Sequence, residues 1–381
     1  MNLKNIKRVL LIVILFVFLI PLVSHIIWRT QPAQEFNVFM VNKTVTNIRH
    51  AEHKSFFWVL NHFKLFKDNG QRYSVKKDYY GFIPLNGRNA NQFETKSIGI
   101  DQIDSLARVI DLAYFADTYG VFSTEWYQTR YGNASTLIYG GLNLTDYLLL
   151  KSLDALAKPV IAEFNFIDYP TNALNNYKVT ELYNLDFTGW KGRYFESLDS
   201  TGNDFLPKWM IRLYQKTHAG AWPFKADGII LVKGGESIVV LESETHLNSS
   251  HPLLLTTPEY IEDYNLPERI RFDKWFQVIE PKTGYDTIAN LGFDVNDLGL
   301  RELEIHRLNP EFPLVFKRIT DGPFIYLAGD FSNNRLPYST FRFWGIEFFE
   351  RMFTSKKYGQ SAFFWNYYIP LMEGILDDLS Y

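Results

Sequence analysis

The 381-residue sequence predicts an α/β fold: a mostly parallel, doubly wound sheet with added antiparallel strands, preceded by one N-terminal transmembrane helix. Two observations predict the sheet. Continuous apolar runs of strand length alternate with amphipathic helical stretches, which is typical of parallel strands buried on both faces. Later in the chain, β-branched runs are joined by short glycine turns, which indicates antiparallel hairpins. A third observation, an apolar run near the start, predicts the transmembrane helix.

The apolar run is Val9–Trp28, and about 20 residues at 1.5 Å per residue would span a hydrocarbon core. Three cations, Lys4, Lys7 and Arg8, precede it and one, Arg29, follows, so we expect a cytoplasmic N-terminus. The prediction is a tail over 1–8, a signal-anchor over 9–28 that contacts the lipid bilayer, a linker over 29–35 and an extracytoplasmic α/β domain over 36–381. A cleaved signal peptide is the alternative, and it would export the same domain.

Composition excludes several classes of function. The net charge of −3 provides no basic field for nucleic acid. The absence of cysteine excludes disulfides, thiolate metal sites and cysteine nucleophiles. The standard motifs of serine hydrolases, dinucleotide-binding proteins, P-loop NTPases and zincins are also absent. We therefore predict no cofactor and no metal, although His50-Ala-Glu-His53 is a weak metal alternative.

The elements follow in order from hydrophobic spacing. Helical spacing predicts helices over 53–66, 100–110 and 143–158, the last capped by Asn143 and stopped by Pro159. Apolar runs predict strands over 36–41, 111–117, 136–139 and 159–166. A hairpin over 228–242 and a strand pair over 312–319 and 324–330 supply the antiparallel part. With neither a long linker nor an internal repeat, the exported part is predicted to be one domain.

Several of these strands end on acids. Asp117, Glu163 and Asp330 fall at predicted strand ends, and Glu125 follows Asp117 on the next loop. In a parallel sheet the ligand crevice lies at the carboxyl ends of the strands. Two carboxylates across a glycosidic bond are the working groups of a glycosidase, so Asp117, Glu163 and Glu125 are candidate catalytic residues. Turn and helix capping is the structural alternative.

Polar, aromatic and glycine residues around these acids are candidate ligand-binding groups. The stretch GWKGRYFESLD offers a cation and aromatic rings that could hold an anion or stack on a sugar, or could fill the core. The candidates for ligand binding are Tyr119, Trp126, Gly140, Gly141, Asn165, Trp190, Arg193 and Asp330.

The unit TLIYGGLNLTDYLLLKSLDALAKPVIAEFN, preceded by DLAYFADTYG, resembles the class I glutamine amidotransferase-like α/β superfamily over residues 36 to 200. In that family a tight glycine turn between a strand and a helix holds the nucleophilic cysteine. This sequence has Gly140-Gly141-Leu142 at that place. The resemblance thus implies the fold with a crevice that lacks the amidotransferase nucleophile.

Three functions follow as expectations. The first is a membrane-anchored extracytoplasmic protein that binds a cell-envelope ligand or partner, such as a glycan. The second is a carboxylate-dependent hydrolase acting on envelope polysaccharide. The third is an accessory subunit of an envelope assembly complex, whose tail (Ser361–Tyr381) docks a partner.

Overall fold

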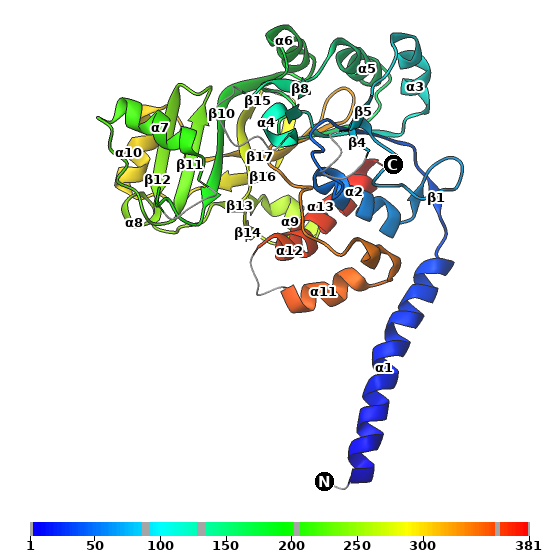
Figure 1. Cartoon of the computed structure of the whole chain (residues 1–381). Helices are drawn as coiled ribbons and strands as arrows, with labels where there is room; N and C mark the ends of the chain where they lie inside the picture. Colours follow the sequence, from blue (N-terminus) through cyan, green and yellow to red (C-terminus); the bar gives the residue numbers. More distant parts are fainter. Residues whose placement is uncertain (1–2, 86–91, 128–134, 202–205, 355–358, 380–381) are drawn as a thin grey trace.

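The structure is a computed structural model of the whole chain, and it describes residues 3–85, 92–127, 135–201, 206–354 and 359–379. The side chains of residues 3–15 and of Val17 also lie outside the description. A mixed α/β body carries a long N-terminal helix, α1 (Leu3–Thr30), that projects away from it (Figure 1). Within the described part of the chain, no helix combines the length and apolarity needed to cross a membrane. The predicted membrane span is therefore not supported by this structure.

A ten-stranded sheet forms the centre of the body, in the order β14-β13-β16-β17-β18-β9-β6-β2-β4-β5. Its five central strands are parallel, and antiparallel strands flank them on both sides. The parallel strands are β2 (Val38–Asn42), β4 (Tyr80–Pro84), β6 (Leu112–Asp117), β9 (Val160–Glu163) and β18 (Phe324–Leu327). The flanking strands are β5 (Phe93–Lys96), β13 (Leu253–Thr256), β14 (Arg269–Arg271), β16 (Tyr285–Gly292) and β17 (Glu311–Arg318).

Helices cover this sheet on both faces, as its buried apolar strands require. Figure 1 shows α3, α5 and α6 along one side and α2 and α13 on the other. Their bounds are α2 (Ala51–His62), α3 (Ile103–Val109, after the 3₁₀ turn η1, Ile100–Gln102), α5 (Leu144–Ala155), α6 (Ala173–Leu182) and α13 (Ile369–Leu379). The predicted Asn143 cap is confirmed: its side chain accepts a hydrogen bond of 3.0 Å from the backbone N of Asp146.

A second sheet of four antiparallel strands, β12-β11-β10-β15, lies beside the first. It consists of β10 (Leu185–Phe195), β11 (Gly228–Lys233), β12 (Ser237–Glu242) and β15 (Phe276–Pro281), and it packs with α7 (Lys208–Thr217), α8 (Ser243–His246) and α10 (Asp297–Ile305). The hairpin predicted over 228–242 is thus confirmed, in this second sheet. The backbone N of Gln277 on β15 donates to the carbonyl of Ala328, which ties the second sheet to the end of β18.

One predicted strand lies elsewhere. The run 136–139 was expected in the parallel sheet, but β8 (Leu137–Tyr139) pairs antiparallel with β7 (Val121–Phe122) outside it. Leu137 is exposed, so β8 does not have the two buried faces of a central strand. The crossover through α5 therefore starts from β6 and not from 136–139, and β6 and β9 are parallel neighbours.

The C-terminal tail packs into the body. Most side chains of α12 (Gln360–Phe363), the π-helical turn η3 (Phe364–Tyr368) and α13 are buried in the main core. The tail is therefore core, and these side chains are not available to dock a partner as the accessory-subunit hypothesis expected. The remaining elements are β1 (Gln34–Glu35), β3 (Leu65–Phe66), α4 (Ser123–Trp126), α9 (Pro258–Asp263), η2 (Tyr338–Arg342) and α11 (Ile346–Thr354).

Candidate functional site

Four carboxyl groups lie at the carboxyl ends of the parallel strands, three of them within electrostatic range of the fourth, Asp330. Asp117 ends β6, Glu163 ends β9, and Asp330 follows β18. Glu52, on the first turn of α2 after β2, is the fourth. Asp330 raises the pKa values of the other three electrostatically, so these side chains are close enough to interact. We call them the four-acid cluster.

The four acids are all shielded from solvent, Glu163 most of all. Glu163 is 1% exposed, whereas Glu52, Asp117 and Asp330 are half-buried as whole residues. Carboxylates are rarely buried without compensation. Here burial raises the pKa of Glu52 and of Asp117 to about 7. Both acids therefore change charge near neutral pH, as general acids and bases do.

Asp117 is held by groups of its own loop and of neighbouring strands. Its Oδ1 accepts a hydrogen bond of 2.7 Å from the backbone N of Tyr119. The side chains of Thr44 and Asn165 also hydrogen-bond to it and partly oppose the rise of its pKa. Asn165 adopts a positive φ of 66°, and its carbonyl accepts a hydrogen bond from the Thr118 hydroxyl. The carboxyl group is thus oriented rather than free to rotate.

Glu163 is held from both sides. Tyr114 donates its hydroxyl to Oε2 at 2.8 Å, and the backbone N of Ser332 donates to Oε1 at 2.5 Å. Burial, reinforced by Asp330, raises the pKa of Glu163 to about 8 despite these two donors. The Ser332 hydroxyl donates to the backbone carbonyl of Glu52, so Ser332 joins two members of the cluster.

Strand β10 of the second sheet and the loop just before β15 each place a cation near the cluster. Lys274 is buried, and its Nζ donates to the carbonyl of Asn333 at 2.9 Å and to Oδ1 of Asn334 at 2.7 Å. Burial lowers the pKa of Lys274 to about 8, and Asp330 and Glu163 oppose that change. Lys274 and Arg193 of β10 in turn restrain the rise in the pKa of Asp330, which burial causes.

Two buried donors beside the cluster are not used by the described protein groups. The Nε of Arg193 and the Nε2 of Gln277 are buried, and no described atom accepts a hydrogen bond from either. The Oε1 of the same Gln277 accepts from the backbone N of Asn165, next to Asp117. Because buried polar groups are nearly always paired, these donors suit a ligand that carries hydrogen-bond acceptors.

The glycine turn predicted to lie beside Asp117 does so. The backbone N of Gly141 donates to the carbonyl of Thr118 at 2.7 Å. A Cβ on Gly140 would lie 2.6 Å from the Cα of Gly120, so the two loops pack backbone against backbone. Buried Lys43 secures the turn by donating to the Gly141 carbonyl at 2.8 Å and by pairing with Asp146 at 2.5 Å.

The structure thus groups Asp117, Glu163, Asp330, Asn165, Arg193 and the glycine turn, and it places other predicted residues apart. Glu125 is exposed on α4. Trp126 is 7% exposed and packs against Phe82 and Phe93, so its ring is core. Trp190 lines a separate cavity of about 180 Å³ with His306.

Tyr119 interacts electrostatically with acids of both sets. Burial raises the pKa of its hydroxyl to about 12, and Glu125 and, more weakly, Asp117 contribute to that rise. Its ring packs beside that of Phe122, with ring centroids 4.9 Å apart.

The His50-Ala-Glu-His53 segment contributes its glutamate, not its histidines. His53 is fully buried and hydrogen-bonds to Asn42 at 2.6 Å and to the carbonyl of Val75 at 2.9 Å. Burial lowers the pKa of His50 to about 4 and that of His53 to about 3. Among the described residues, no group of three or more His, Cys, Asp or Glu side chains could hold a metal ion.

Sequence reasoning missed Glu52 as a member of the cluster, and also Lys274, Gln277 and Ser332. The signal for Glu52 was its position: it is the acid in the first turn of the helix that follows the first parallel strand. Nothing local marks Lys274 or Gln277, because the pairing of β15 with the end of the main sheet brings them there.

Comparison with known proteins adds little. No protein-family model matches the chain, and no curated protein matches it. A solved structure of a protein described as ThuA-like, from Bacteroides uniformis, aligns with 87% of this chain and 97% of its own length, at 10% identity and a TM-score of 0.39. A likeness at this level carries no argument about function.

Proposed function

We propose that the chain binds a hydroxyl-rich ligand, a glycan of the cell envelope, at the four-acid cluster, and that it has no cysteine-dependent amidotransferase activity. The observation that carries the proposal is the coexistence of half-buried acids with buried donors on Arg193 and Gln277 that no described atom accepts from. Sugar hydroxyls both donate and accept hydrogen bonds, so one ligand of this class would satisfy both sets. The relationship to the amidotransferase-like superfamily is part of this proposal and rests on the β6-α5-β9 unit and the Gly140-Gly141 turn.

The test is affinity electrophoresis through gels that contain glycol chitin, hydroxyethyl cellulose or alginate. The wild-type chain should be retarded in at least one gel. Asp117→Asn and Arg193→Gln should each relieve the retardation several-fold, whereas Glu244→Gln, an exposed acid on α8, should not. Two results would contradict binding of these glycan classes at the cluster: equal retardation of all four proteins, or no retardation of the wild type in any of the gels.

A second candidate function is carboxylate-dependent hydrolysis of the same ligand class. The pKa values near 7 of Glu52 and Asp117 favour it, because one acid can be protonated while its neighbour is ionised. The pair we favour is Asp117 with Glu52 or Asp330, which are less buried than Glu163, whereas Glu125 lies on α4. Release of new reducing ends from the three polysaccharides, abolished in Asp117→Asn, is the measurement that separates hydrolysis from binding.

Membrane anchoring through residues 9–28 is the last part of the proposal. It is supported by the apolar run itself and by seven exposed apolar side chains on the described part of α1: Phe16, Phe18, Leu19, Ile20, Leu22, Val23 and Ile26. Single-pass insertion with the main domain outside the cytoplasm predicts that alkaline carbonate leaves the full chain in the membrane pellet. It also predicts that added protease digests the body in spheroplasts. Release by carbonate would contradict insertion.

A further inference from the structure

A cavity lined by cations lies where α1 joins the body. It has a volume of about 340 Å³, and its lining includes Arg29, Lys64, Arg72 and Arg342. Among the described residues, none of these four cations forms an ion pair with a carboxylate. Concentrated positive charge without a protein counter-ion suits an anionic group.

Aromatic side chains form the rest of the lining, so the cavity is amphipathic. The Nζ of Lys64 lies 5.0 Å from the ring centroid of Trp28, and the guanidinium carbon of Arg72 lies 5.9 Å from it. Lys64 is 8% exposed and also donates to the carbonyls of Arg29 and Gln31. Lys64 and Arg72 are thus positioned by aromatic rings, and Lys64 also by carbonyls.

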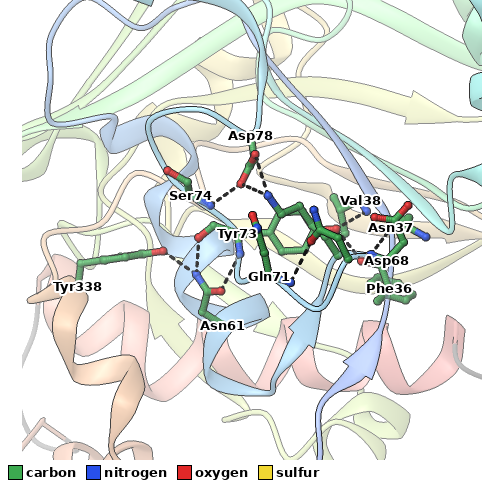
Figure 2. Close-up of polar contacts among 12 residues, drawn as sticks. Phe36, Asn37, Val38, Asn61, Asp68, Gln71, Tyr73, Ser74, Asp78 and Tyr338 are labelled. Atoms are coloured by element: carbon green, nitrogen blue, oxygen red, sulfur yellow. Dashed lines mark hydrogen bonds and ion pairs between the residues drawn. The ribbon is translucent and has the colours of Figure 1, made fainter.

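The loop that carries Arg72 is fixed by the network in Figure 2. The hydroxyl of Tyr73 donates to the carbonyl of Phe36 at 2.6 Å and accepts from the backbone N of Val38 at 2.7 Å. The side chain of Asn61 bonds both backbone polar groups of Tyr73, and it donates at 2.8 Å to the hydroxyl of Tyr338 in η2, the turn that ends at Arg342. Both arginines are therefore on restrained segments.

Helix α11 beside the cavity has its apolar side outward. Four large apolar residues at helical spacing, together with Trp344 just before the helix, are 53% to 70% exposed: Trp344, Phe348, Phe349, Met352 and Phe353. The polar side of α11 contacts the body. Glu347 lies 3.0 Å from the ring nitrogen of His62, and Arg351 donates a hydrogen bond to the carbonyl of Trp365. A surface helix of a globular protein normally turns its apolar side toward the core and its polar side toward water.

The segment just before α11 is hydrogen-bonded to α1. The hydroxyl of Ser24 donates to the carbonyl of Trp344 at 2.8 Å, and the ring of His25 hydrogen-bonds to the carbonyl of Arg342 at 3.1 Å. Figure 1 shows α11 lying crosswise beside the end of α1 that meets the body. If α1 enters a bilayer, α11 would lie flat on its surface, where amphipathic helices bind.

We propose that the cavity of Arg29, Lys64, Arg72 and Arg342 binds the headgroup phosphate of an anionic phospholipid, whose acyl chains lie along the exposed apolar faces of α1 and α11. This inference rests on the membrane anchoring proposed above. A phospholipid fits better than a free phosphate ion because the cavity adjoins two apolar helix surfaces. The four-acid cluster lies at the other end of the parallel strands, since the Tyr73 network contacts the start of β2 and the acids follow the strand ends.

Native mass spectrometry of the full chain in detergent micelles tests the proposal. The probes are phosphatidylglycerol and phosphatidylcholine with the same acyl chains, and inorganic phosphate as a competitor. The wild type should retain one phosphatidylglycerol in preference to phosphatidylcholine. The variant Arg72→Gln/Arg342→Gln should lose that preference about tenfold or more, and Phe348→Ser/Met352→Ser should weaken retention of both lipids.

The charge-matched control is Arg212→Gln/Lys216→Gln, two exposed cations on α7, which should retain lipid as the wild type does. Arg342→Gln alone removes an exposed side chain, so it gives a folded variant with an intermediate loss should the double variant unfold. Equal retention by wild type and Arg342→Gln, or no preference for phosphatidylglycerol, would overturn the proposal. Displacement of the lipid by an equal concentration of inorganic phosphate would instead identify a free-anion site.

The two proposals fail separately. Release of the chain by carbonate contradicts anchoring whatever the micelle result, whereas a carbonate-resistant chain with unselective lipid retention contradicts only the headgroup site.

Discussion

The backbone N of Ser332 donates a hydrogen bond of 2.5 Å to Oε1 of Glu163, a carboxyl group that is 1% exposed. The donor comes from the loop after β18 and the acceptor from the end of β9, so this bond fastens two neighbouring parallel strands at their carboxyl ends. It does not keep Glu163 ionised, because burial and Asp330 raise the pKa to about 8. Glu163 therefore couples the stability of the cluster to pH.

Glu163→Gln should flatten the dependence of stability on pH. A raised folded-state pKa means that the folded chain binds more protons than the unfolded chain between about pH 4.5 and 8, so stability falls as pH rises through this window. Glutamine keeps an oxygen that accepts from the Ser332 backbone N, its amide nitrogen can donate to the Tyr114 hydroxyl, and the titration is removed. Urea denaturation at pH 5 and pH 8 should show a loss that is smaller than in wild type by roughly 3 kcal/mol.

Glu244→Gln is the matched control for that experiment, because this acid is exposed on α8. It should keep the wild-type difference between pH 5 and pH 8. A Glu163→Gln chain with the wild-type difference would mean that Glu163 is already ionised in the folded protein.

The parallel centre of the fold was readable because burial on both faces produces continuous apolar runs. Leu112–Asp117, the helix with its Asn143 cap and the buried strand after that helix are found as the pattern predicted. The run 136–139 was misplaced because a strand of three residues has too few positions to distinguish a central strand from a local pair.

The candidate site was only partly readable. Strand ends indicated Asp117, Glu163 and Asp330, since topology alone brings the ends of parallel strands together. Lys274 arrives by contact between two sheets, which leaves no periodic trace in the sequence. Trp126 was predicted to bind a ligand, but its ring fills a small core. The sequence cannot distinguish these two roles, because an aromatic residue on a predicted loop is compatible with both.

Lys43→Met should destabilise the protein by about 3 to 5 kcal/mol, because it leaves the carboxylate of Asp146 buried without its cation. The double variant Lys43→Met/Asp146→Asn should cost at least about 1 kcal/mol less than the sum of the single variants. Urea unfolding of all four proteins measures this coupling. Lys67→Met, which breaks the more exposed pair with Asp78, should destabilise the protein by under about 1 kcal/mol. A cost for Lys43→Met as small as this would show that the buried pair does not stabilise the fold.

Gly141→Ala should disrupt the turn beside Asp117. Gly141 has a φ of +71°, and a Cβ there would lie 2.9 Å from the backbone N of Thr171. Left-handed backbone and a clash with main chain together should cost about 3 kcal/mol in thermal or urea unfolding.

Gly220→Ala separates the two causes. Gly220 has a φ of +78°, but a Cβ there would have no neighbour within 4 Å. Its cost should be about 1 kcal/mol, from the backbone alone. Equal costs for the two variants would show that the close packing of Gly141 against Thr171 is absent.

Tyr73→Phe should destabilise the end of the fold next to α1. Removing the hydroxyl leaves the carbonyl of Phe36 and the backbone N of Val38 without the partner that bridges them, and Tyr73 is only 5% exposed. Losing a buried bridging group should cost about 2 kcal/mol, whereas Tyr177→Phe, at an exposed tyrosine on α6, should cost under about 0.5 kcal/mol. Hydrogen exchange measured by mass spectrometry should show faster exchange at Val38 and around Arg72, with the strand ends at Asp117 and Glu163 unchanged. Uniformly faster exchange across the sheet would mean that the network supports the whole fold and not the segment that carries Arg72.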